Sequence, residues 1–242
     1  LEHNRNNRNK TQKPIKIMKM KQNGGFTLIE LLVVITIIAI LASFAVPVFN
    51  KVVTSAQQTK QINNLKQIAL ACSLFASDNS GIYPTGGIVD GVLTDAEGGN
   101  AEDCFNDLMK TGALAVEKVF WNPQNKTMCK PSAPNENNEL QPGENCWEYM
   151  FGLSNSSSPT LPLVYEASNG GTTWAAADGH PWETKMIVAF VDGSAEKVNL
   201  STTGEAKVNR NDNIVDLCVP VPGSDGWPAS AARKEATAGG AG

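Results

Sequence analysis

A junction near the N-terminus holds the residues whose types and spacing could support chemistry. Gly24 and Gly25 end a basic, polar stretch, Phe26 follows them, and Glu30 is the only charge in the run GGFTLIELLVVITIIAIL. A secretory signal has small residues after its apolar region, whereas here they precede it. We therefore expect proteolysis after Gly25, which has no side chain to keep a protease away. The cut frees the α-amine of Phe26 and leaves the apolar segment on the mature chain.

Glu30 lies where a charge is costly. A carboxylate costs on the order of 2.5–3.5 kcal/mol near the centre of a bilayer, so it is usually kept for a partner. The freed α-amine of Phe26 is a cation at the same depth. The alternative is an interfacial Glu30 that only extends its carboxylate to the lipid head groups.

The segment from Leu31 to Phe49 is poor in charge and long enough to cross a bilayer core. The first 25 residues carry a net charge of +6, which keeps that end cytoplasmic and sends the rest across an inner membrane. Since the whole chain carries −4, residues 26–242 carry about −10, and we expect no nucleic-acid binding. We expect the natural start at Met18 or Met20, which gives a leader of a few residues.

The membrane segment should continue as an amphipathic helix. Apolar residues recur at spacings near the helical period of 3.6 from Lys51 to Ala76. Asp78, Asn79 and Gly81 then mark a helix end, with a proline shortly afterwards. The pattern predicts one helix from Phe26 to about Asp78, kinked or loosened at Pro47.

The junction GGFTLIE and residues 64–84, NLKQIALACSLFASDNSGIYP, resemble type IV prepilins and type II secretion pseudopilins. The resemblance implies cleavage after Gly25 by a prepilin peptidase and N-methylation of Phe26. It also implies that Glu30 of one subunit pairs with the Phe26 amine of a neighbour in a filament. This chain departs from the pattern of the group at two places. Eleven residues instead of nine separate His180 from Asp192-Gly193, and Asn122-Pro123 stands where Cys-Pro is expected.

The remaining chain predicts a small α+β domain of the pilin-like kind, with the long helix packed on a small antiparallel sheet and long disulfide-stapled loops. Asn100 can cap a helix over residues 101–110. Asp192-Gly193 predicts a hairpin between strands 185–191 and 194–200, and residues 161–166 and 214–219 are further strand candidates. The expected organisation is a cleaved leader (1–25), a transmembrane and filament-core helix (26–49), its amphipathic continuation (50–80), an extracytoplasmic globular domain (81–228) and a flexible tail (229–242).

Four of the five cysteines, Cys104, Cys129, Cys146 and Cys218, would lie outside the cytoplasm, where disulfides persist. We expect two bridges among them, and the sequence does not choose between the three pairings. Cys72, on the apolar face of the helix, should pack as a small hydrophobe. No CxxC or paired-histidine spacing supports a zinc site.

The chain has no pattern typical of an enzyme. His3 lies in the leader, and His180 is a single histidine in a loop without a nucleophile motif. Loop carboxylates such as Asp90, Asp178 and Asp212 could include calcium ligands, but no EF-hand-like array is present, and solvated turn residues are the simpler interpretation. No other cofactor is expected. The tryptophans should form core and loop clusters.

Two functional classes therefore remain. The first is a structural subunit of a type IV pilus or type II secretion pseudopilus, which would contact other pilin or pseudopilin subunits, prepilin peptidase and assembly platform proteins. It would leave the inner membrane for a periplasmic or extracellular filament. The second is a minor or solitary membrane-tethered binding protein that uses the same signal for display.

Overall fold

The computed structural model describes residues 25–89, 92–93, 99–126, 128–130, 132–167, 182, 185–200, 207–210, 213–216 and 232–234. The chain divides into two units, Leu1–Lys51 and Val52–Gly242, which are described separately below. The helices are α1 (Leu28–Asp78), α2 (Ala101–Lys110) and the short 3-10 helix η1 (Glu117–Val119). The strands are β1 (Ile88–Val89), β2 (Val92–Leu93), β3 (Trp147–Phe151), β4 (Pro162–Glu166), β5 (Lys185–Phe190), β6 (Ala195–Asn199), β7 (Lys207–Arg210), β8 (Asn213–Asp216) and β9 (Ala232–Lys234).

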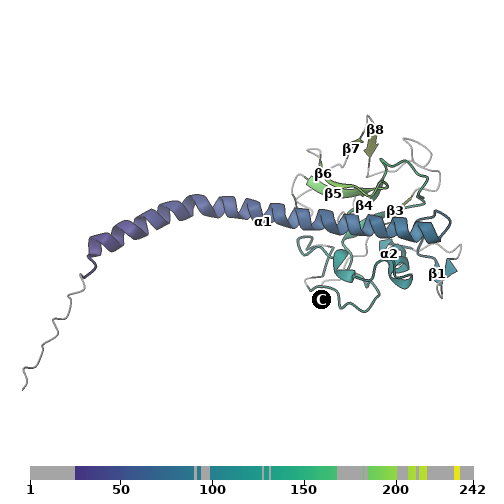
Figure 1. Cartoon of the computed structure of the whole chain (residues 1–242), viewed down its shortest axis with the longest axis horizontal. Coiled ribbons are helices and arrows are strands. Elements are labelled where there is room, and N and C mark those ends of the chain that lie inside the picture. Colours follow the sequence, from purple (N-terminus) through teal and green to yellow (C-terminus); the bar gives the residue numbers. More distant parts are fainter. Residues whose placement is uncertain are drawn as a thin grey trace, which may run out of the picture. The chain divides into compact units, whose positions relative to one another are not determined.

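The first unit contains the N-terminal part of α1. This helix is long and apolar enough to cross a membrane, with a mean hydropathy of 2.8 in its most apolar window. All side chains described in residues 25–51 are exposed. The helix continues without a break through Pro47 (Figure 1). An apolar surface of this length needs lipid or neighbouring helices to cover it, because water does not solvate it favourably.

The second unit is built on an antiparallel sheet in the order β6-β5-β4-β3-β9. The predicted hairpin is formed by β5 and β6, with Met186 opposite Val198, and Gly193 takes a φ of 78° in the turn between them. β4 matches the third strand candidate. The fourth candidate corresponds to β8, which pairs with β7 in a separate two-stranded sheet instead of joining the main one. The α+β fold with a long N-terminal helix is confirmed.

One hydrophobic core joins the second half of α1, α2 and the main sheet. In Figure 1 this part of α1 runs among α2, β3 and β4, and the buried residues of these elements form a single cluster. Cys72 is 0% exposed within it, which confirms its predicted role as a small buried residue. The tryptophan prediction is confirmed for Trp147 and Trp182, which are both buried. The predicted role of Trp174 and Trp227 lies outside the described residues.

The predicted end of α1 is confirmed. The helix ends at Asp78, and the backbone N–H of Gly81 donates to the carbonyl of Ala76 at 2.8 Å. Ser80 and Gly81 take positive φ values of 55° and 83°, a left-handed conformation typical of helix C-termini. The chain then turns back, so that the hydroxyl of Tyr83 donates to the carbonyl of Val191 on the sheet at 3.4 Å.

The predicted helix at residues 101–110 is confirmed as α2. Its first turn has a complete capping box, in which Asn100 accepts from the N–H of Asp103 and the Asp103 carboxylate accepts from the N–H of Asn100. Further along, Asp107 is 0% exposed and accepts backbone N–H groups from Thr85 at 3.2 Å, Gly86 at 2.6 Å and Ile88 at 3.1 Å. Asp107 therefore anchors the segment after α1 to α2.

We expect the Asp107→Ala variant to lower the free energy of unfolding by about 2–4 kcal/mol, because it leaves the buried N–H of Ile88 and the part-buried N–H groups of Thr85 and Gly86 without this acceptor. Chemical denaturation of the protein, followed by circular dichroism, measures this loss. Asp103→Ala is the matched control, since Asp103 accepts from one exposed N–H group, that of Gly99, and one part-buried N–H group, that of Asn100. Removing such a cap costs about 1 kcal/mol. Equal losses for the two variants would contradict the anchoring role of Asp107.

The cysteine prediction is partly wrong. Cys129 and Cys146 form a disulfide, but Cys104 is a buried thiol on α2 and takes no part in one. Cys218 lies outside the described residues. Cys104 is on the inward face of an amphipathic helix, and this position brings it into the core instead of toward the loops that hold Cys129 and Cys146.

A buried carboxylate holds the loops around the bridge. Glu166, at the end of β4, is 0% exposed and accepts from the indole N–H of Trp182, from Nδ2 of Asn122 at 3.2 Å and from the N–H of Ile187 at 2.9 Å. The N–H of Asn122 also contacts Sγ of Cys146 at 3.0 Å. Asn122, which stands where the family pattern has cysteine, is thus held by one hydrogen bond to Glu166 and one to Cys146.

The prediction of a flexible tail over residues 229–242 did not include a strand. Residues 232–234 form β9, which pairs with β3 through Tyr149–Lys234, Met150–Arg233 and Phe151–Ala232. β3 itself was also missed, because all five of its residues are buried and the alternation typical of a half-exposed strand is lost.

Candidate functional site

The residues around the predicted cleavage junction form a compact hydrogen-bonded unit at the start of α1. Both the backbone N–H and the hydroxyl of Thr27 donate to Oε2 of Glu30, at 2.8 Å and 2.6 Å. In return, the N–H of Glu30 donates to the hydroxyl oxygen of Thr27 at 3.3 Å. Thr27 precedes the first residue of the helix and Glu30 is the third residue within it, so the pair is a capping box.

The capping box gives Glu30 a role within its own helix. It accepts N–H and O–H groups at a helix N-terminus, where the helix dipole also favours a negative charge. Among the described residues, hydrogen bonds reach only Oε2, which leaves Oε1 as an acceptor for a second donor. The spacing Thr-x-x-Glu in TLIE is the sequence pattern of a capping box. The prediction from the sequence concerned only Glu30 and missed the role of Thr27.

The two residues on either side of the predicted cut are accessible. Phe26 is 72% exposed, and with Ile29, Glu30 and Val33 it lines a shallow, mostly apolar hollow of about 360 Å³. Gly25 is exposed too, and a Cβ added to it would meet no atom within 4 Å. The structure therefore brings Gly25, Phe26 and Glu30 to one end of the helix, and nothing in the fold itself requires glycine before Phe26.

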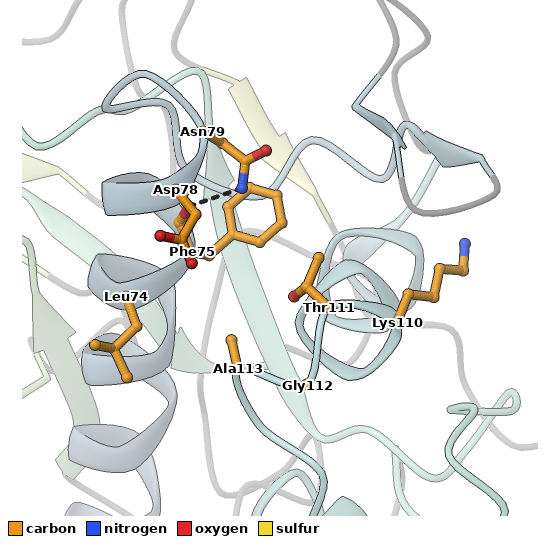
Figure 2. A pocket seen from close by; sticks show the side chains of 8 residues that line it. All are labelled: Leu74, Phe75, Asp78, Asn79, Lys110, Thr111, Gly112 and Ala113. Atoms are coloured by element: carbon orange, nitrogen blue, oxygen red, sulfur yellow. Dashed lines mark hydrogen bonds between the residues drawn. The ribbon is translucent and has the colours of Figure 1, made fainter.

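A second hollow, of about 550 Å³, lies where α1 and α2 both end (Figure 2). Leu74, Phe75 and Asp78 of α1 line one side, and Thr111 and Ala113 line the other. Figure 2 shows the Phe75 ring lying between the two sides. The hollow is an ordinary groove between two helix ends, with no convergent set of catalytic side chains among its lining residues.

The structure does not describe the other candidate residues that the sequence offered. These are His180, Asp90, Asp178 and Asp212. Within the described part of the chain, no three His, Cys, Asp or Glu side chains gather closely enough to hold a metal ion.

Comparison with known proteins agrees with the geometry of the N-terminus. Residues 20–46 match the family described as the prokaryotic N-terminal methylation motif. This segment contains Gly25, Phe26, Thr27 and Glu30. The N-terminus of the chain is therefore prepilin-like, and it leads into a helix that is long and apolar enough to cross a membrane.

Three curated relatives make this class more specific. The chain is 40% identical over 67 residues to the type II secretion system core protein G of Vibrio cholerae, which covers 28% of this chain and 45% of that protein. It is 38% identical over 68 residues to the core protein G of Pseudomonas aeruginosa, covering 28% and 47%. It is 44% identical over 57 residues to the type IV major pilin protein PilA of Myxococcus xanthus, covering 24% and 26%.

The chain thus spans less than half the length of the curated relatives that it matches. No solved structure matches it significantly. The matches are thus to two secretion-system core proteins and a major pilin. On these grounds the chain is a type IV prepilin-like or type II secretion pseudopilin-like protein.

Proposed function

We propose that this chain is a structural subunit of a type IV pilus or a type II secretion pseudopilus. Prepilin peptidase cleaves it between Gly25 and Phe26, Phe26 is N-methylated, and the helix that follows packs with other pilin or pseudopilin subunits. Before assembly the helix crosses the inner membrane, with the second unit on the extracytoplasmic side and assembly platform proteins at the membrane. The capping box of Thr27 and Glu30 at the start of a fully exposed apolar helix is the observation that carries the proposal.

The exposed helix surface supports assembly. Sixteen apolar residues from Phe26 to Phe49 are between 45% and 82% exposed. Lipid satisfies such a surface before assembly, and the same surfaces on neighbouring subunits satisfy it afterwards. A fully apolar helix would serve as a simple anchor equally well, so the presence of Glu30 favours a subunit over an anchor.

Glu30 can serve both the free and the assembled subunit. In the free subunit Thr27 satisfies one carboxylate oxygen, which lowers the cost of carrying the acid in lipid. In a filament the other oxygen is placed to accept the α-amine of a neighbour's Phe26. A charge pair of this kind in an apolar surrounding gives the axial stacking a defined register.

The fibre itself provides the test. Filaments sheared from cells that make the full chain should contain this protein, with an intact mass that reports removal of residues 1–25 and one added methyl group. A shortened and methylated chain that stays in the membrane fraction, under conditions in which other subunits reach the filaments, would contradict the assembly role. That result would favour a membrane-tethered binding protein.

A further inference from the structure

The end of α1 carries exposed apolar surface in the second unit. Among the described residues after Val53, four large apolar side chains are exposed, Leu70 (59%), Leu74 (53%), Ile82 (43%) and Val116 (50%). Three of the four belong to the last turns of α1 or follow its end directly. This surface adjoins the groove between the ends of α1 and α2, because Leu74 lines that groove.

A negative charge at this end of α1 has no counterpart. Asp78, the last residue of the helix, is exposed, and the last turn contains no basic residue, although the helix dipole favours a cation there. Within the described part of the chain, no ion pair reaches its carboxylate. Across the groove, Lys110 donates through Nζ to the carbonyl of Ile88 at 3.1 Å, and Figure 2 shows its side chain pointing away from Asp78. Leu74 and Asp78 thus form an acidic patch on one rim of the groove.

A second patch on the same helix has the opposite charge. Lys66 and Leu70 are one turn apart and both exposed, and the described residues place no ion pair on the Lys66 ammonium. Lys66 and Asp78 are separated by 12 positions. At 3.6 residues per turn and 1.5 Å per residue, this basic patch lies about a third of a turn around α1 from the acidic patch and about 18 Å along it.

The two patches complement each other, but neither complements itself. Each contains one charge and one leucine a turn apart on the helix surface. Two copies that met through the same patch would bring like charges together, which is unfavourable. Patches that differ in direction and in height can instead join copies that run in the same direction and are displaced along the axis. Such a head-to-tail contact does not close on itself and continues into an open filament.

We propose that the acidic patch of one subunit binds the basic patch of a second copy of this chain, which is shifted by about 18 Å along α1. The inference rests on the proposed function, because it requires parallel copies in a filament. The same shift brings the neighbour's Leu70 to the level of the end of α1, where Ile82 is exposed. Pairing of Glu30 with a neighbour's Phe26 corresponds to a shift of only about four residues, so the two contacts join a subunit to two different neighbours.

Cross-linking of intact filaments tests the contact. Lys66→Cys and Asp78→Cys are placed together in the full chain, and sheared filaments are treated with a bismaleimide much shorter than the roughly 18 Å between the two positions within one subunit. The two new thiols can then be joined only between subunits. The chain without these substitutions, treated in the same way, gives the background from the native cysteines.

The double variant should give a ladder of dimers, trimers and longer products, because each subunit is linked to one neighbour through position 66 and to another through position 78. Either substitution alone should give only the background. Filaments that contain the double variant and show no ladder would overturn the contact and leave the proposed function intact. If the unmodified chain is absent from filaments, the proposed function fails and the contact fails with it.

Lys60 provides the matched control. It is exposed like Lys66, but its 18 positions from Asp78 make about five full turns, so it lies on the same side of α1 as Asp78. The pair Lys60→Cys and Asp78→Cys should therefore give no ladder. A ladder as strong as that of the first pair would contradict the proposed register.

A charge exchange tests the electrostatic part of the contact, in cells that make only the variant chain. Asp78→Lys and Lys66→Asp should each lower incorporation into filaments roughly fivefold, because each brings two like charges together, and the two combined should restore it. Asp78→Lys places a cation at a helix C-terminus, so its thermal midpoint should not fall, and its loss of assembly is not a loss of folding. A combined variant that assembles no better than the single variants would refute the charge pairing.

Discussion

The Gly25→Val variant should accumulate as a precursor that retains its basic leader. Gly25 is exposed, and an added Cβ meets no atom within 4 Å, so the substitution should not disturb the protein itself. The effect arises where the backbone must fit closely into the peptidase. A clash worth about 1.4 kcal/mol in the cleavage transition state lowers the rate tenfold, so we expect at least about tenfold less mature chain.

Intact mass and N-terminal sequencing of the membrane fraction measure this outcome. Asn23→Val is the control, since it places the same valine side chain two residues before Gly25 and should leave mature Phe26 at the N-terminus. The appearance of Phe26 in the Gly25→Val variant at the normal rate would show that cleavage does not occur after residue 25.

The second large effect is expected at Glu30. The Glu30→Val variant should insert into the membrane normally, because it removes a charge from an apolar segment. It should enter filaments at least about tenfold less than the unmodified chain, since each 1.4 kcal/mol of lost subunit pairing corresponds to a factor of ten. Quantitative immunoblotting of sheared filaments against the membrane fraction measures the ratio.

The capping box makes it possible to separate the two roles of this residue. Glu30→Gln keeps an oxygen acceptor for Thr27 and removes the charge, because glutamine also completes a capping box. If pairing with the Phe26 amine drives assembly, Glu30→Gln should fail as Glu30→Val does. Thr27→Val instead removes the cap and keeps the charge, so it should assemble far better than either. Normal filament yield from Glu30→Gln would contradict the charge pair and leave only the helix cap.

The sequence predicted the elements that are defined by neighbouring residues. Asn100 and Asp103 are three positions apart, and this spacing alone specifies the start of α2. Asp192-Gly193 specifies the β5–β6 turn in the same way, because Gly193 supplies the positive φ that the turn needs. The N-terminal helix followed from a long apolar run.

Elements that depend on distant contacts were not predictable in this way. Trp147–Phe151 is buried along its whole length, so neither face shows the polar positions that mark a strand. Cys104 could not be separated from the bridged cysteines, because spacing along the chain does not reveal which face of α2 turns inward. At the candidate site the sequence indicated Gly25, Phe26 and Glu30, and the Thr-x-x-Glu spacing could also have indicated the helix cap, whose hydrogen bonds the structure shows.

The position of β9 bears on how the protein should be shortened for laboratory work. β9 is hydrogen-bonded along β3, which would otherwise be an outer strand of the main sheet. A version truncated before Ala232 would leave a row of backbone N–H and C=O groups on β3 open to pairing with another molecule. Such a fragment should be prone to edge-to-edge self-association in solution, which could be mistaken for fibre formation.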